Sequence, residues 1–284
     1  MPELPEVQTT VNGLNSTVKG RTIIDVSTTY DSKAYRGKDE IKNPEYFRQF
    51  RNKIRGKKIL EAERMGKNIL IHLSHNQTIL THMKLTGHYV YNRVVPHTRL
   101  DFELDKDNHL YLSDLRKFAK VTLIPTNELK GSSHLSNLGP EPLEENFQFS
   151  VFNSQLKRRP RGKIKQVLMD PKIIAGIGNI YSDEILWRAG VHPLSITDKI
   201  PEKNMKEMYK IMQEVLRKGI LLGGDSMSDY RDIRGELGQF QEHHRAYQKH
   251  GTKCMKTRCS GVLEKIRING RSAHFCPKHQ RLYK

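Results

Sequence analysis

Apolar residues near the start of the chain recur every three or four positions. They are Leu4, Val7, Val11, Leu14 and Val18. This spacing predicts an amphipathic helix that buries one face. Pro2 therefore lies at the N-terminal end of the predicted helix.

From about residue 23 to residue 124 the apolar pattern changes to period two, which is typical of strands. One example is a hairpin pattern in which the polar stretch 105–108 separates two alternating segments, 100–104 and 110–112. Several such segments within about one hundred residues indicate a β-sandwich or barrel.

The chain then passes through residues that end regular structure. Residues 131–134 are small and polar, and residues 138–142 contain two prolines, which continue neither a helix nor a central strand. Helical periodicity returns afterwards, for example in the segment that begins at Pro201. We expect an N-terminal domain at 1–132, a linker at 133–150, a helical domain at 151–248 and a short C-terminal segment at 249–284.

The charge of the chain narrows the choice of partner. Its 284 residues contain 49 Lys and Arg against 31 Asp and Glu, a formal net charge of +18, so an extended polyanion is the first partner to consider. A ribosomal or otherwise non-specific basic protein is the alternative. No apolar stretch is long enough to span a bilayer, and the first residues lack the basic and apolar regions of a signal peptide. We therefore expect the cytosol or nucleus.

The last 31 residues contain all three cysteines of the chain. Cys254 and Cys259 form one close pair, and sixteen residues later Cys276 and His279 form a second pair. Two close ligand pairs separated by a hairpin fit a tetrahedral structural zinc site. The alternative is a segment that holds no metal and folds by packing alone.

Between the two ligand pairs, Asn269-Gly270 is a strong signal for a tight hairpin turn. The hairpin projects Arg271 from its tip. Residues 249–284 contain ten Lys or Arg and one acidic residue, Glu264, a net charge of +9. A basic β-ribbon that is stabilised by zinc and binds DNA would account for both the ligand spacing and the positive charge.

Removal of Met1 would make Pro2 an N-terminal secondary amine. An α-amino group has a pKa of about 7.7–8.0, against about 10.4 for lysine, so it is partly unprotonated near neutral pH. It could attack the anomeric carbon of a deoxyribose and form an iminium that promotes elimination of the phosphates, with Glu3 as the proton shuttle. The alternative is that Pro2 merely starts the helix and Glu3 complements its dipole.

Residues 175–181, AGIGNIY, form a glycine-rich turn between two helical patterns. Glycines allow a backbone to approach a phosphate closely, and the following helix N-terminus favours an anion. The spacing is not that of a dinucleotide-binding fingerprint. A plain connector between helices is the alternative.

Together these features resemble the formamidopyrimidine-DNA glycosylases of the bacterial Fpg/Nei group along nearly the whole chain. The opening MPELPEV is similar to the Fpg form of the start. The resemblance continues through residues 66–67, 82–87, 116–118, 138–142 and 176–181 and ends at Arg271. Any one match could arise by chance, whereas their shared order and spacing identify the family.

The resemblance implies a role for each matching residue. Pro2 is the nucleophile, Glu3 the general acid and base, and Lys67, on a strand, a cation near the target sugar and phosphate. Asn179 and Arg271 clamp phosphates, helped by His82 and Lys165. Leu85, Arg116 and Phe118 fill the gap in the duplex when the damaged nucleotide flips out.

The segment from residue 223 to 239 resembles a mobile loop that closes over the flipped base. Its hydroxyl groups, on Ser226, Ser228 and Tyr230, are expected to help read oxidised purines together with the backbone. An ordinary flexible loop is the alternative. Cys254, Cys259, Cys276 and His279 are the implied ligands of one structural Zn²⁺.

The expected fold is α+β and multidomain: an N-terminal helix plus β-sandwich, a helical helix-two-turns-helix domain, and a C-terminal zinc β-ribbon finger. Damaged double-stranded DNA is the expected partner, bound by a monomer in a basic cleft between domains. The expected reaction is excision of 8-oxoguanine and formamidopyrimidines followed by β,δ-elimination. The location would be cytoplasmic and nucleoid-associated in a bacterium, or nuclear in a eukaryote.

Three features depart from the family pattern. In the finger, the first cysteine pair is separated by four residues where the family has two, and the last ligand is His279 where the family has cysteine. Leu85 replaces the commoner methionine. Ala119 stands where glycine often follows the phenylalanine that enters the duplex. Two rival functions remain open: a Nei-like preference for oxidised pyrimidines, and a DNA-binding protein that recognises damage without cutting.

Overall fold

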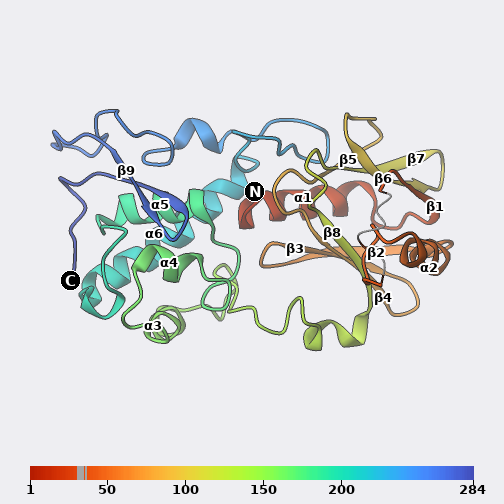
Figure 1. The fold of residues 1–284 in the computed structure, drawn as a ribbon, viewed down its shortest axis with the longest axis horizontal. Helices are drawn as coiled ribbons and strands as arrows, with labels where there is room; N and C mark the ends of the chain where they lie inside the picture. The colour runs from red at the N-terminus through yellow and green to blue at the C-terminus, as the bar shows by residue number, and fades with distance from the viewer. Residues whose placement is uncertain (31–34, 36) are drawn as a thin grey trace. The chain divides into compact units, whose positions relative to one another are not determined.

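The computed structural model describes residues 1–30, 35 and 37–284 (Figure 1). By their internal contacts these residues divide into two compact units. The first comprises residues 1–136 and 222–239, and the second comprises residues 137–221 and 240–284.

The described residues of the first unit form two α-helices and eight strands. In chain order they are α1 (Leu4–Thr17), β1 (Ile23–Thr28), α2 (Pro44–Ile54), β2 (Ile59–Met65), β3 (Asn68–Leu73), β4 (Gln77–His82), β5 (His88–Tyr91), β6 (Thr98–Leu104), β7 (Asn108–Ser113) and β8 (Lys120–Pro125). The strands form two four-stranded antiparallel sheets, with the orders β1-β6-β7-β5 and β2-β3-β4-β8. Period two predicts a β-sandwich or barrel, and the two sheets form the sandwich.

One apolar core joins the two sheets and the first helix. Val7 and Val11 of α1 lie in it with Phe102 of β6 and Ile71 of β3. The predicted apolar stripe of α1 is thus the face that packs on the strands. This packing fixes the N-terminal end of α1, and with it Pro2.

The second unit is built on helices and carries a hairpin near its end. Its elements are α3 (Phe149–Lys157), α4 (Ile164–Met169), α5 (Asn179–Ala189), α6 (Glu202–Leu221), β9 (Glu264–Ile268) and β10 (Arg271–Phe275). Helix α5 packs against α4, α6 and β10. Within the part of the chain that the structure describes, no helix has both the length and the apolar character needed to cross a membrane.

A buried carboxylate and a hairpin turn organise this unit. Buried Glu184 of α5 accepts hydrogen bonds from three successive backbone N–H groups at residues 245–247, at 2.9–3.0 Å, which ties the approach to the hairpin to the helix. Strands β9 and β10 pair in antiparallel register from Arg271–Ile268 to Phe275–Glu264. Asn269 and Gly270 both have positive φ, 44° and 79°, as the predicted Asn-Gly turn requires.

Candidate functional site

Pro2 is buried and lies outside the first helix. Helix α1 begins at Leu4 with Glu3 as its N-cap, and the proline in its first turn is Pro5. Pro2 is therefore not the helix-starting proline, because that position belongs to Pro5. The preceding Met1 is 39% exposed, so it is accessible for removal.

A buried glutamate holds the backbone beside Pro2. Glu6 is 1% exposed, and its Oε2 accepts a hydrogen bond from the backbone N–H of Glu3 at 2.7 Å, part of a capping box. Its Oε1 accepts from the N–H of Asp225 at 2.8 Å. One carboxylate thus joins the N-terminal end of α1 to the start of the loop at 222–239. The sequence assigned Glu6 no role.

Further contacts fasten the same loop to α1. The Tyr230 hydroxyl donates to the carbonyl oxygen of Glu6 at 2.9 Å. A Cβ on Gly224, which has a φ of +84°, would come within 2.9 Å of the Glu6 Cγ, and a Cβ on Gly13 within 2.5 Å of Ile233. Both glycines are therefore needed for close approach of loop and helix.

The three hydroxyl groups expected to read a base differ in their surroundings. Tyr230 is buried and donates to α1, and buried Ser226 accepts from the N–H of Gly238 at 2.9 Å. Ser228 is exposed. In this arrangement Tyr230 and Ser226 hold the loop, and Ser228 is the hydroxyl on its surface.

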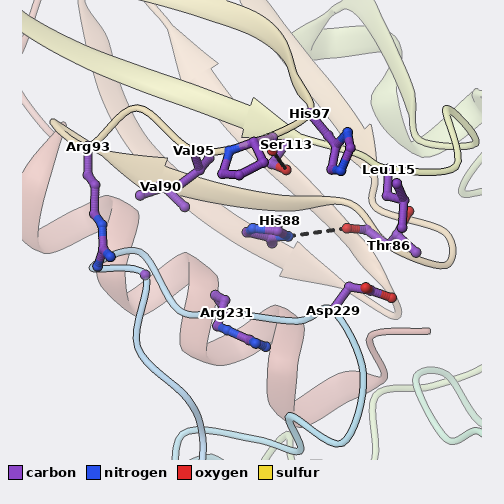
Figure 2. Close-up of a pocket in the computed structure, with 12 residues that line it drawn as sticks. Thr86, His88, Val90, Arg93, Val95, His97, Ser113, Leu115, Asp229 and Arg231 are labelled. Carbon is purple, nitrogen blue, oxygen red and sulfur yellow. Dashed lines mark hydrogen bonds between the residues drawn. The ribbon is translucent and has the colours of Figure 1, made fainter.

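A pocket of about 310 Å³ lies between this loop and the sheet of β5 and β7 (Figure 2). Figure 2 shows His88 between His97 and Ser113 on one side and Asp229 and Arg231 on the other. The Nδ1 of His88 bonds to the carbonyl oxygen of Thr86 at 3.2 Å. Burial lowers the pKa of His88, which favours the neutral ring. Because a carbonyl oxygen can only accept, Nδ1 carries the proton and Nε2 is left as an acceptor.

Lys67 and His82 lie close together at one end of the other sheet. Lys67 is in the tight turn between β2 and β3, so the expectation that it lies on a strand is wrong; Gly66, with a φ of 59°, makes the turn. His82 pairs with Asn68, the residue after Lys67. Burial, together with the charges of Lys84 and Lys67, lowers the pKa of His82 to about 3. Its Nδ1 accepts from the N–H of Lys84 at 3.0 Å, which leaves Nε2–H as a neutral donor.

Asp114 organises the residues matched to the duplex-filling positions. It is fully buried and accepts from the Thr86 hydroxyl at 2.5 Å and from the N–H of Ala119 at 2.7 Å. Thr86 follows Leu85, and its Oγ1 also accepts from the N–H of Arg116 at 3.0 Å. The segments that carry Leu85 and Arg116 are therefore bonded to each other. Sequence reasoning missed Asp114.

Arg116 and Phe118 are both exposed, and the Arg116 guanidinium lies over the Phe118 ring at 4.9 Å. Phe118 is 46% exposed, so it is not a core residue. Ala119 is fully buried in the sandwich core. Its methyl group would lie 3.3 Å from a Cβ added at Gly87, which shows that alanine here packs against a glycine.

In the second unit, Lys165 is buried against α5. It is 1% exposed and forms an ion pair with Asp183, and its Nζ also donates to the carbonyl oxygen of Asn179 at 3.4 Å. The other oxygen of Asp183 accepts from the N–H and Nδ1 of His274 on β10, at 3.0 and 2.9 Å. Asp183 and His274 were not found from the sequence.

Asn179 and Arg271 lie at the N-terminus of α5 and the start of β10. The Asn179 Nδ2 donates to the Ser272 hydroxyl at 3.2 Å, next to Arg271. Lys165 and Arg271 line one pocket of about 190 Å³. The structure thus brings together the three residues of this unit that were expected to bind phosphate.

Cys254, Cys259, Cys276 and His279 form a cluster in which one ligand atom from each lies within 4.8 Å of the others. The Cys254 Sγ and the His279 Nδ1 are 3.2 Å apart, and the Sγ atoms of Cys259 and Cys276 are 3.7 Å apart. A Cys₃His donor set of this size fits one tetrahedral Zn²⁺. The predicted ligand set is thereby brought together.

Comparisons with known proteins agree with this arrangement. Sequence profiles of the formamidopyrimidine-DNA glycosylase N-terminal domain and H2TH domain match residues 1–121 and 138–231. A formamidopyrimidine-DNA glycosylase from Pelotomaculum thermopropionicum is 34% identical over 286 residues, covering 99% of this chain and all of that protein.

Solved structures of a Lactococcus lactis enzyme are similar throughout. The complex between Lactococcus lactis Fpg and DNA containing an abasic site has a TM-score of 0.85 at 32% identity and covers 97% of this chain and 98% of that one. A complex between a point mutant of that enzyme and DNA containing Fapy-dG gives the same values. The chain belongs to the formamidopyrimidine-DNA glycosylase family.

Proposed function

We propose that this chain is a bifunctional DNA glycosylase and AP lyase of base excision repair, with damaged double-stranded DNA as its substrate. The observation that carries the proposal is the N-terminus itself: Pro2 precedes the helix cap, and Glu6 fixes the adjoining backbone. The DNA complexes of the Lactococcus lactis relative support the choice of substrate.

The proposed reaction begins once Met1 is removed. The Pro2 nitrogen attacks C1′ of the damaged nucleotide, the bond from C1′ to the base breaks, and the base leaves with a proton. The ring opens to an iminium between Pro2 and C1′, which acidifies the C2′ proton. Abstraction of that proton expels the 3′ phosphate, and a second elimination expels the 5′ phosphate. Glu3 carries protons in these steps.

The remaining site residues receive roles in binding. Lys67 and His82 contact phosphate or sugar, His82 through a neutral Nε2–H and not through a charge, because its pKa is about 3. Leu85, Arg116 and Phe118 enter the duplex where the damaged nucleotide leaves it. Asn179 and Arg271 bind phosphates directly. Lys165 orients the N-terminus of α5 through its hydrogen bond to the Asn179 carbonyl oxygen.

We propose oxidised purines, 8-oxoguanine and formamidopyrimidines, as the lesions. The pocket under the loop offers His88, Asp229 and Arg231 as donors and acceptors for a planar base, and Ser228 with the loop backbone completes the set. Cleavage of matched duplexes containing 8-oxoguanine or 5,6-dihydrouracil tests this: faster cutting of the dihydrouracil duplex would favour a Nei-like range instead.

Borohydride trapping on an 8-oxoguanine duplex tests the reaction. The parent protein should form a covalent complex, and Pro2→Gly should trap far less. Absence of any complex with the parent would support a protein that binds damage without cutting. Because the similar glycosylases come from bacteria, we propose a cytoplasmic, nucleoid-associated location.

A further inference from the structure

The imidazole of His279 has a contact on each of its two nitrogens. Nδ1 faces the thiol cluster, 3.2 Å from the Cys254 Sγ. Nε2 lies 2.9 Å from the carbonyl oxygen of Trp187, and since a carbonyl can only accept, Nε2 carries the proton. That tautomer leaves the lone pair of Nδ1 directed at the metal position.

The accepting carbonyl belongs to the last turn of α5. Helix α5 ends at Ala189, and Gly190 caps it with a φ of 66°. Trp187 is one of the four residues whose carbonyls have no partner further along the helix. Its oxygen accepts from the N–H of Gly190 at 3.2 Å and from His279. A metal-bound imidazole, being polarised by the cation, is also favourable at the negative end of a helix.

The Trp187 side chain packs in the same place. Its ring lies edge-on to the His279 ring, with centroids 5.1 Å apart and planes at 82°, and it is buried in a cluster with Cys254 and Cys276. Its Nε1 has no hydrogen-bond partner among the described residues. Trp187 is the single tryptophan of the chain, so indole fluorescence reports on this one position.

We infer that His279 is a positioning residue as well as a metal ligand: it holds zinc through Nδ1 and the C-terminal turn of α5 through Nε2–H. A cysteine at this position would bind the metal but has no second donor for the Trp187 carbonyl. The departure from four cysteines therefore adds a direct connection between the metal and α5. This inference is independent of the reaction proposed for Pro2.

The connection matters because α5 carries contacts at its other positions too. Asn179 at its N-terminus bonds to Ser272, and Asp183 bonds to His274. Occupancy of the metal site should therefore alter the order of the last turn of α5, in the same helix that carries the phosphate-binding candidate Asn179.

The test uses the full-length zinc-loaded chain and the variant H279C, with H250C as the matched control, since His250 is an exposed histidine of the same segment. All three proteins should contain one zinc by elemental analysis. In H279C, amide hydrogen exchange at Gly190 and Val191 should be about 3- to 10-fold faster, as expected for loss of one hydrogen bond, and Trp187 emission should shift. H250C should match the parent.

If zinc-loaded H279C matches the parent in both exchange and emission, His279 is a ligand only and the inference is wrong. Should H279C fail to fold or to bind zinc, the parent still decides the question through a long-range proton–nitrogen NMR spectrum. A protonated, slowly exchanging Nε2 with the metal on Nδ1 supports the inference. The opposite tautomer, with the metal on Nε2, overturns it.

Discussion

Helices α1 and α5 place candidate residues at their N-termini in the same way but hold them with different chemistry. At α1, buried Glu6 accepts hydrogen bonds from the neutral backbone N–H groups of Glu3 and Asp225. At α5, buried Asp183 pairs with the ammonium group of Lys165 and with His274. The first arrangement joins a helix to a loop with neutral donors, and the second fixes a helix to a hairpin with a buried charge pair.

The difference has an energetic consequence. Breaking a buried ion pair leaves an uncompensated charge, which costs several kcal/mol, whereas an unsatisfied buried amide costs about 1–3 kcal/mol. Loosening the contacts of Glu6 with the loop at 222–239 is therefore expected to cost less than breaking the Asp183–Lys165 pair. The finger hairpin is expected to stay in place on α5.

The largest predicted loss of stability follows from removing one partner of the Asp183–Lys165 ion pair. Asp183→Asn leaves the Lys165 ammonium buried without its counter-ion and should lower the free energy of unfolding by about 3–5 kcal/mol, measured by urea denaturation. The double variant Asp183→Asn/Lys165→Met removes both charges and should recover most of that loss. If the single variant is as stable as the parent, the pair does not hold α5.

Glu6→Gln should have the next largest effect. A glutamine has one acceptor oxygen where the carboxylate has two, so one of the two N–H groups loses its partner at a cost of up to about 3 kcal/mol. Loop 222–239 should become more sensitive to protease, and base excision should slow more than cutting at a preformed abasic site. The exposed Glu236→Gln in the same loop is the control. Equal slowing of both steps would count against a role in loop closure.

The third prediction concerns how the stability of the protein depends on pH through the neutral side chain of His82. Its pKa of about 3 lies below the ordinary value of 6.5, so the folded protein excludes the proton. Its contribution to stability is complete above pH 6.5 and is lost as the pH falls toward 3, by about 1.4 kcal/mol per pH unit.

Between pH 7 and pH 5, the parent should therefore lose about 2 kcal/mol more stability than His82→Gln, as measured by urea unfolding at both values. An identical loss in the two proteins would show that His82 is protonated in the folded state.

The smallest effect is expected for Tyr230→Phe. It removes the hydrogen bond from the Tyr230 hydroxyl to the Glu6 carbonyl oxygen, worth about 0.5–1.5 kcal/mol, together with the longer contact to the Thr10 hydroxyl at 3.5 Å, and it keeps the ring in place. Thermal denaturation should show a small decrease, and excision should slow less than in Glu6→Gln. A larger loss than in Glu6→Gln would reverse the assigned order of the two contacts.

The sequence predicted what is set by local periodicity. The stripe of α1, the alternating strands and the Asn269-Gly270 turn depend on neighbours in the chain, and all three are present. The four metal ligands were also found, because their spacing reflects the geometry of one ion.

Contacts between residues far apart in the sequence could not be predicted from the sequence alone. Glu6 and Asp225 are 219 residues apart in sequence, and no periodic pattern links them. The sequence alone gives no sign that Lys165 is buried, and only the fold shows it paired with Asp183. The roles carried over by resemblance for Lys67, Asn179, Arg271 and the loop hydroxyls stay predictions.

The most direct test of the central claim is to locate the covalent bond. After borohydride trapping on an 8-oxoguanine duplex, proteolysis and mass spectrometry should find the sugar adduct on the peptide that begins with Pro2. A variant with an uncleavable extension before Pro2 should give no adduct, since its nitrogen is then an amide. An adduct on Lys67 or another lysine in the parent protein would contradict the assignment of Pro2 as the nucleophile.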